Sequence, residues 1–313
     1  MLDRVGLVIP VQDEETSIMA LLRSIGRQRR PPDEVVLVDA GSRDDTVERA
    51  LSIVSSCPLK IVRSERVHPG VARNRGVGAS EESEWIAFTD AGIVLHPDWL
   101  RELLAAADER TDAVLGNFDP ICTSFFHECA ALAYVPARDP HGIRGPCVAS
   151  CLVRRSTFQR VGGFPPYRAA EDLMFVERLY AVAAHVAYAP RAVVDWAIAG
   201  TARATFDRFA SYSHHNLIAG RGRHWHAGVA RLYGLLAVAA GLAYVMGGDV
   251  LAWLVPPAFF AARAAKAAWI KRRSFAFSTL HPARVVGAAS ILAVIDLATA
   301  VGTCRWLVGR LRR

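Results

Sequence analysis

The 313-residue sequence predicts an α/β fold, in which helices flank a sheet, followed by a hydrophobic helical part. Short apolar runs bounded by turn residues predict buried strands at 5–10, 34–39, 59–63 and 85–89. Segments of helical periodicity separate these runs, and strands that alternate with helices are typical of a sheet with parallel strands. Beyond residue 202 long apolar stretches begin, and they predict a different kind of structure.

The helices between the strands are expected at 14–27, 44–54, 71–79, 99–109 and 171–179. Further strands are expected at 113–117, 148–154 and 182–190, whereas residues 120–146 have no assignable pattern. In open sheets of this kind, ligands bind beyond the carboxyl ends of the strands. We therefore expect a binding rim formed by residues 10–15, 39–42 and 90–92.

The hydrophobic part contains three stretches, 229–247, 250–270 and 285–308, each near the ~20 residues that a helical membrane span requires. Arg263 in the second stretch and Asp296 in the third are costly at the middle of a bilayer. Three spans would export the basic C-terminal tail, against the positive-inside tendency. Two spans, with the remaining segment on the membrane surface, would keep this tail inside. Both arrangements stay open.

Charge and cysteine usage restrict the partners. The net charge of +7 comes from separate basic clusters without an interleaved aromatic face, which favours anionic lipid headgroups over nucleic acid. The six cysteines include no Cys-x-x-Cys pair, so we expect reduced thiols and no zinc knuckle. The start of the chain lacks the features of a signal peptide, and the N-terminal part is expected on the cytoplasmic side of the cell membrane.

Five motifs occur in a fixed order: VIPVQDEE at 8–15, VDAGSRDDT at 38–46, ARNRG at 72–76, FTDAG at 88–92 and AED at 170–172. Together they resemble the inverting family 2 glycosyltransferases, and the resemblance covers about two thirds of the chain. It implies the GT-A fold, a Rossmann-like mixed sheet that binds a nucleotide-diphosphate sugar. It also implies a catalytic domain at 1–204. The basic and apolar patterns that follow predict an interfacial segment at 205–230 and membrane helices at 231–313.

A strand-end carboxylate suits the nucleoside of the donor, since it accepts hydrogen bonds from a base N–H or from ribose hydroxyls. The resemblance implies this role for Asp39, with Pro10, Val11, Glu14 and Ser42 shaping the same pocket. The alternative is that Asp39 and Ser42 only cap the next helix.

The diphosphate leaving group must be neutralised, and the resemblance implies a divalent cation, Mn²⁺ or Mg²⁺, bound by Asp90. The usual second carboxylate is absent, because Gly92 takes its place. Mg²⁺ accepts one or two protein carboxylates and fills its shell with water and phosphate oxygens, so one Asp is compatible with binding. Arg73 is a candidate for contacting phosphate.

Besides binding the nucleoside and neutralising the diphosphate, the reaction requires a base that takes the proton of the acceptor hydroxyl. Asp172 matches the Glu-Asp motif of the family and is the predicted base, with Glu171 as its orienting neighbour. The alternative is that both are first-turn acidic residues placed by the helix dipole. His214, Arg221 and Trp225 belong to a cationic and aromatic segment that favours anchoring at the membrane surface.

The interrupted apolar stretches and the lack of a processive-synthase motif predict transfer of a single sugar, and the hydrophobic region predicts a lipid-linked or membrane-embedded acceptor. The resemblance favours a UDP-sugar as the donor. A dehydrogenase is disfavoured because residues 10–15 contain no glycine, and no Walker motif occurs. The main alternative is a catalytically inactive membrane protein that keeps the fold and either binds a nucleotide sugar or serves as a scaffold.

Overall fold

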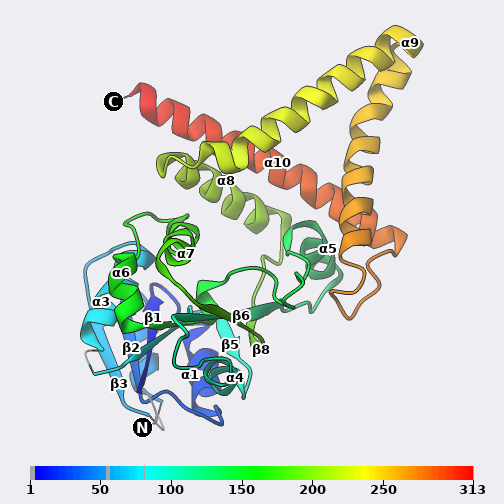
Figure 1. The fold of residues 1–313 in the computed structure, drawn as a ribbon. Helices are drawn as coiled ribbons and strands as arrows, with labels where there is room; N and C mark the ends of the chain where they lie inside the picture. Colours follow the sequence, from blue (N-terminus) through cyan, green and yellow to red (C-terminus); the bar gives the residue numbers. More distant parts are fainter. Residues whose placement is uncertain (1–3, 54–56, 81, 313) are drawn as a thin grey trace. The chain divides into compact units, whose positions relative to one another are not determined.

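The computed structural model describes residues 4–53, 57–80 and 82–312. The chain divides into two compact units. The first contains the residues up to Pro120 together with Arg138–Ala197, and the second contains Ile121–Ala137 together with the chain from Ile198 onward. Figure 1 shows the course of the chain through both units.

The first unit is built on one mixed sheet with the strand order β3-β2-β1-β4-β7-β6-β8-β5. Its strands are β1 (Val5–Val11), β2 (Glu34–Asp39), β3 (Leu59–Arg63), β4 (Trp85–Phe88), β5 (Ile93–Leu95), β6 (Ala113–Pro120), β7 (Cys151–Arg154) and β8 (Val186–Trp196). The first four strands pair in parallel, β7 is antiparallel to both β4 and β6, and β5 is antiparallel to β8. The expected mixed sheet is therefore confirmed.

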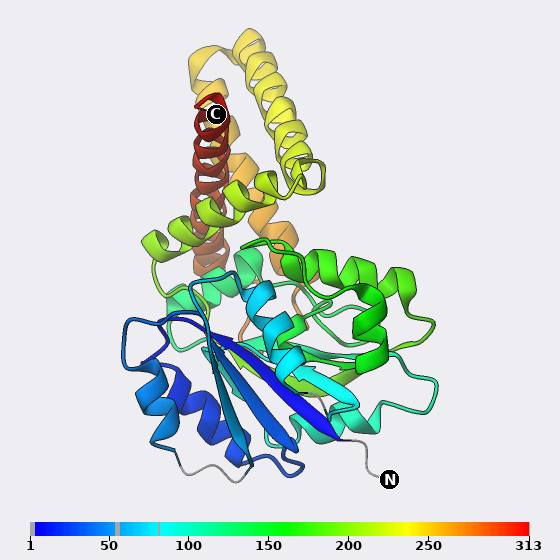
Figure 2. The same ribbon diagram turned by 90° about the vertical axis from the view of Figure 1, so that its left-hand side faces the viewer.

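Strands β1 and β4 are apolar along their whole length, as expected where helices cover both faces of a sheet (Figures 1 and 2). Side chains of alternating residues enter different cores. Leu7 and Ile9 pack in the same cluster as Leu21 of α1, whereas Val8 belongs to the cluster that contains Ala72 of α3. Helices packed on both faces hold β1, β2 and β4 in place, so the loops at their carboxyl ends lie along the same edge of the sheet.

The helices of the first unit agree with most of the expected ones. They are α1 (Ile18–Gly26), α2 (Thr46–Leu51), α3 (Pro69–Ala79), α4 (Trp99–Ala105), α6 (Arg155–Val161) and α7 (Glu171–Val182), with a 3-10 turn at Val148–Ser150. The helix expected at 44–54 is shorter than predicted, and Val54 lies outside the described residues. The strand expected at 182–190 begins later, since Val182 still belongs to α7.

One buried carboxylate, Asp112, ties the start of β6 to two other segments. It accepts hydrogen bonds from the Thr157 hydroxyl at 2.7 Å and from Arg160 at 2.6 Å, both in α6. Its other oxygen accepts from the backbone N–H groups of Ala184 at 2.8 Å and His185 at 3.1 Å, ahead of β8. Burial acts to raise the pKa of Asp112, but these hydrogen bonds outweigh it and lower the pKa to about 2.

Asp112→Asn is expected to lower the free energy of unfolding by on the order of 2 kcal/mol at neutral pH. Because the pKa is depressed in the folded state, this contribution is present above about pH 4 and is lost as the pH falls towards 2. Thermal unfolding followed between pH 7 and pH 3 measures it, with Asp195→Asn, at a half-exposed site, as the control. An identical acid dependence in Asp112→Asn and the parent would contradict this assignment.

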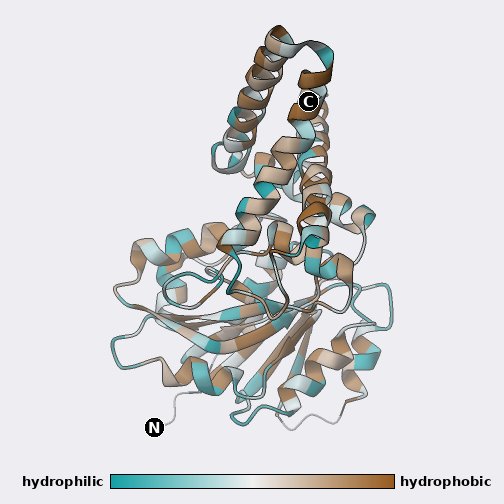
Figure 3. Ribbon diagram, turned by 90° about the vertical axis from the view of Figure 1, so that its right-hand side faces the viewer, coloured by the Kyte–Doolittle hydropathy of each residue, from teal (hydrophilic) through white to brown (hydrophobic). Residues whose placement is uncertain are grey.

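The second unit is helical. It consists of α5 (Phe125–Tyr134), α8 (Ala202–Ile218), α9 (Gly222–Ile270) and α10 (Pro282–Leu311). Helix α5 lies in the segment that had no assignable pattern. The first two expected apolar stretches both belong to α9, whose helical geometry is interrupted at Gly248, with φ 70° and ψ −163°. In the described chain α9 and α10 are the two helices long and apolar enough to cross a membrane (Figure 3).

Candidate active site

The ends of β1 and β2 form the first part of the site. Val11 pairs with Asp39 in the parallel register, so both strands end at the same level. The buried carboxylate of Asp39 accepts a hydrogen bond from the backbone N–H of Ser42 at 3.0 Å. Between Asp39 and Ser42 the chain turns at Gly41, whose φ of 76° is a conformation that glycine adopts without strain.

Two loops are joined across this end of the sheet. The backbone N–H of Asp13 donates to the Ser42 hydroxyl at 3.0 Å, and that of Glu14 donates to the Thr46 hydroxyl at 2.7 Å. Burial raises the pKa of Glu14, and the charges of Asp44, Asp90 and Asp13 add to this rise. The influence of the Asp90 charge on Glu14 indicates that Asp90, which follows β4, lies near these two loops.

The Arg73 guanidinium is the centre of this second group. Its Nη2 donates to Asp90 Oδ1 at 2.5 Å, and its Nη1 donates to Asp172 Oδ1 at 2.8 Å. The same Nη1 lies 3.8 Å from Glu171 Oε1. Arg73 comes from α3, Asp90 follows β4, and the other two residues open α7. The fold thus gathers three carboxylates from two distant segments around one cation, and we call these four residues the Arg73 cluster.

Burial sets the electrostatics of the Arg73 cluster. The side chains of Arg73 and Glu171 are buried, whereas those of Asp90 and Asp172 are 34% and 41% exposed. Burial raises the pKa of Glu171 to about 7, and the neighbouring charge of Asp172 adds to the rise. Although the Asp172 side chain is partly exposed, desolvation of its carboxyl group raises its pKa, against the opposing effect of Arg73. The two exposed carboxylates are therefore the ones that a ligand can reach.

Close packing between α3 and the loop before α7 holds the Arg73 cluster together. Asn74 donates to the Phe164 carbonyl at 2.9 Å and accepts from the Phe164 N–H at 2.8 Å. A Cβ at Gly70 would lie 2.9 Å from both Phe164 Cβ and the Pro165 carbonyl oxygen, so only glycine permits this approach. Ala170, which directly precedes the two carboxylates, has φ 140°, a strained conformation of the kind found at functional sites.

Among the described residues no three His, Cys, Asp or Glu side chains are grouped so that they could hold a metal ion. At the predicted metal site Asp90 supplies one carboxylate, and one of its oxygens is engaged by Arg73. Gly92 contributes no ligand, and a Cβ there would meet only open space. This donor set fits an ion shared with substrate phosphates and water, and it does not fit a cage made by the protein alone.

The structure brings the predicted site residues to one side of the sheet, in two groups. Asp39, Ser42 and Glu14 belong to the joined loops, together with the strand-end residues Pro10 and Val11. Arg73, Asp90, Glu171 and Asp172 form the Arg73 cluster. No sequence pattern pointed to Gly70 or to Cys147. Burial raises the pKa of the Cys147 thiol to about 12, and the charges of Asp90 and Asp172 add to this rise.

The cationic and aromatic segment around residues 214–226 belongs to the second unit, at the end of α8 and the start of α9. There Ser213 Oγ lies 2.9 Å from His226 Nε2 and donates to the Thr299 carbonyl of α10 at 2.8 Å. That the segment at residues 214–226 anchors the protein at the membrane surface stays a prediction.

Comparison with known proteins shows a similarity to one family over about half of the chain. Residues 7–157 match the family described as Glycosyl transferase family 2. The putative glycosyltransferase EpsH of Bacillus subtilis is 30% identical over 115 residues, which cover 36% of this chain and 33% of EpsH. The O-antigen chain rhamnosyltransferase WbaN of Salmonella anatum is 26% identical over 204 residues, covering 58% of this chain and 62% of WbaN. The chain therefore spans less than two thirds of either relative.

A solved structure supports the same fold. The mannosyltransferase PcManGT from Pyrobaculum calidifontis superimposes with a TM-score of 0.62 at 21% identity, over 95% of this chain and 87% of that protein. The mixed sheet, the matched family region and this likeness agree with one another. The chain is similar to glycosyltransferase family 2 over the matched residues and has the GT-A fold, followed by two apolar C-terminal helices.

Proposed function

We propose that this glycosyltransferase moves a single sugar from a nucleotide-diphosphate sugar, with a UDP-sugar favoured, to a membrane-associated hydroxyl or phosphate, with inversion at the anomeric carbon. One observation carries the proposal. The half-exposed carboxylate of Asp172 is joined through Arg73 to Asp90, at the rim where β1 and β2 end. The proposed base, Asp172, and the carboxylate proposed to lie near the diphosphate, Asp90, are thus both bonded to Arg73.

The joined loops are the proposed donor site. Asp39 accepts hydrogen bonds from the base or the ribose, and its carboxylate is oriented by the Ser42 N–H. Pro10 and Val11 provide the apolar floor at the end of β1. The backbone hydrogen bonds from Asp13 and Glu14 hold the two loops in register before the donor binds, which lowers the entropic cost of binding.

Asp172 is the proposed general base. With a hydroxyl acceptor, Asp172 accepts the hydroxyl proton while the oxygen forms its bond to the anomeric carbon and the bond from this carbon to the phosphate oxygen breaks. A phosphate acceptor attacks as an oxyanion and transfers no proton. The nucleoside diphosphate leaves with the bonding electrons. Glu171 keeps the side chain of Asp172 oriented through the shared guanidinium of Arg73. The base must be ionised, so transfer should increase as the pH rises through the elevated pKa of this carboxylate pair.

The leaving diphosphate requires positive charge. PcManGT was solved with GDP-Man and Mn²⁺, and this supports a divalent cation here as well. Asp90 would hold the ion together with donor phosphates, and the ion would act as a Lewis acid towards the diphosphate. A direct contact of Arg73 with phosphate is part of the same proposal.

EDTA is expected to lower transfer by about tenfold or more, and added Mn²⁺ or Mg²⁺ should restore it. Asp90→Asn should require a higher ion concentration for half-maximal transfer, because it removes the charge that the protein contributes and keeps the shape of the side chain. Initial rates measured across a series of Mn²⁺ concentrations give both values. Undiminished transfer in EDTA would mean that positively charged side chains, without a metal ion, neutralise the leaving group.

The acceptor is proposed to be lipid-linked, such as a polyprenyl phosphate or a glycolipid, at the cell membrane. Two apolar helices after the catalytic fold support membrane association. In this proposal residues 1–204 catalyse transfer on the cytoplasmic side, 205–230 lie at the membrane surface and 231–313 anchor the protein.

The proposal is tested with detergent-purified protein, a panel of UDP- and GDP-sugars, and a membrane lipid extract as acceptor. Incorporation of labelled sugar into the lipid fraction from one donor is the expected result. If no donor binds and none is consumed, the inactive scaffold is the better account. Donor hydrolysis without incorporation would retain the enzyme and reject the lipid acceptor.

A further inference from the structure

The membrane-facing part of the second unit differs sharply between its two apolar helices. In the most apolar stretch of α9, 0% of the residues are buried, against 44% in α10. Val245 and Met246, just before the interruption of α9, are each 82% exposed, and Val250 and Trp253 beyond it are exposed almost as much. An apolar surface of this extent has to be covered by something other than the described chain.

The interruption at Gly248 makes α9 a helical hairpin, with one leg at 222–247 and a second at 249–270 (Figures 1 and 3). Residues 232–248 carry no charged side chain, and at 1.5 Å per residue they reach about 25 Å. The uncharged part of the return leg, 250–262, reaches about 20 Å. The hydrocarbon core of a bilayer is ~30 Å thick, so the legs come close to crossing it, with Asp249 at the tip.

Helix α10 is held by polar elements along most of its length. Near its start, Arg284 donates to Glu128 of α5 at 2.6 Å. Further along, the Thr299 carbonyl accepts from Ser213 of α8 at 2.8 Å, and Gly302 packs directly against the α8 backbone. Helix α8 exposes charged side chains such as Arg203, so it belongs outside the hydrocarbon. The part of α10 that packs against α8 therefore lies outside the hydrocarbon as well.

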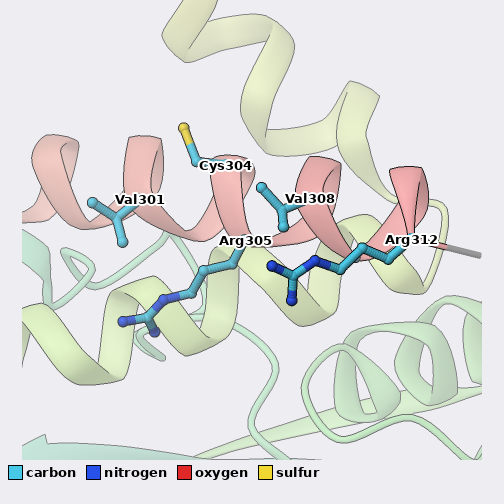
Figure 4. A pocket seen from close by; sticks show the side chains of 6 residues that line it. Val301, Cys304, Arg305, Val308 and Arg312 are labelled. Atoms are coloured by element: carbon cyan, nitrogen blue, oxygen red, sulfur yellow. The ribbon is translucent and has the colours of Figure 1, made fainter.

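The charges of α10 agree with this placement. Its longest uncharged run, 285–295, reaches only about 17 Å, well short of the bilayer core. At its end an open pocket is lined by alternating apolar and basic side chains, and Arg305 and Arg312 project from one side of the helix (Figure 4). Two guanidinium groups with Val308 between them suit the level of lipid phosphates.

The foot of the hairpin is fixed to α10 by a polar cluster. Asp296 of α10 accepts from Tyr233 of the first leg at 2.9 Å and from Arg263 of the second leg at 3.3 Å. At the end of α9, Lys271 donates to the Leu132 carbonyl of α5 at 2.7 Å. Both legs of the hairpin are therefore attached to α10 or α5 at their ends away from the tip. The part of α9 between this cluster and the tip has no such attachment among the described residues.

On the basis of the proposed membrane association, we infer that the α9 hairpin alone enters the bilayer, and that α10 stays outside the hydrocarbon on the side of the catalytic unit. The tip at Gly248 and Asp249 lies near the opposite headgroups. The basic end of α10 then stays on the cytoplasmic side, as the positive-inside tendency requires. The partner that covers α9 is the lipid bilayer.

The test is cysteine labelling in the full-length protein with Cys304→Ala, which removes the exposed native thiol. Asp249→Cys and Arg312→Cys are introduced separately, and an impermeant maleimide is applied to right-side-out spheroplasts and to inverted vesicles. Cys304→Ala alone reports the background, and detergent shows that each probe can react. We expect position 249 to react only from outside the cell and position 312 only in inverted vesicles.

Labelling of both positions from outside the cell would show that α10 crosses the bilayer and would overturn the inference. Labelling of position 249 in inverted vesicles, or from neither side, would overturn the crossing hairpin. Neither reading depends on sugar transfer, which is measured separately in the same vesicles. Loss of transfer with the expected labelling would thus count against the proposed function alone.

Discussion

Arg73→Met is expected to leave only a small residual transfer rate and to destabilise the first unit by roughly 3–5 kcal/mol. Arg73 is buried and bonds to Asp172 at 2.8 Å and to Asp90 at 2.5 Å, with Glu171 within 3.8 Å. Removing the cation leaves three neighbouring carboxylates without a counter-charge, which costs far more than the loss of one hydrogen bond. Thermal unfolding and initial transfer rates, measured on the same preparation, give the two effects.

A pH profile separates this electrostatic role from simple packing. Arg73 opposes the rise in the pKa of Asp172, so without Arg73 the pKa rises further and residual transfer should shift to higher pH. Arg73→Lys, which keeps the charge, should recover part of the shift. Arg75→Met is the matched control on the same helix, because Arg75 is more exposed and pairs with Glu65 at 3.6 Å, an interaction worth at most about 1 kcal/mol. Equal losses in the Arg73 and Arg75 variants would contradict the cluster as described.

Asp172→Asn is expected to lower the transfer rate by about 10²–10⁴-fold, the range for loss of a general base. Asparagine keeps the size of the side chain and can still accept a hydrogen bond from Arg73, so the fold and donor binding should be preserved. Calorimetric titration with the nucleoside diphosphate and initial-rate measurements test the two halves of this expectation.

Glu177→Gln serves as the control for Asp172→Asn, because Glu177 lies on the same helix with an exposed side chain. It removes one negative charge from α7 and should leave the transfer rate within about twofold. A similar decrease in both variants would assign the effect to the charge of the helix. Normal transfer by Asp172→Asn would exclude Asp172 as the base.

Much of the catalytic fold was predictable because its strands are short, apolar and bounded by clear turn signals. Residues 5–10 and 34–39 were expected as strands and form β1 and β2 with boundaries shifted by one residue at most. The rim was predictable for the same reason, since it follows from where parallel strands end. β5 was not expected, because a run of three residues, Ile93–Leu95, carries no periodicity.

The arrangement of the Arg73 cluster could not be predicted from sequence. Arg73 and Asp172 are 99 residues apart, and their contact depends on the packing that Gly70 and Asn74 permit between α3 and the loop before α7. Nothing in a local pattern shows that a glycine faces another segment. Similarly, the separate role of α10 is decided by what it packs against, whereas hydropathy treats its apolar stretch like those of α9.

The central claim is a single displacement assisted by a base, and the configuration of the first product tests it most directly. A donor of known anomeric configuration is supplied to the purified protein, and the anomeric proton of the newly formed product is followed by NMR from the first turnovers. The account predicts the opposite configuration from that of the donor. A product that keeps the donor's configuration would contradict it.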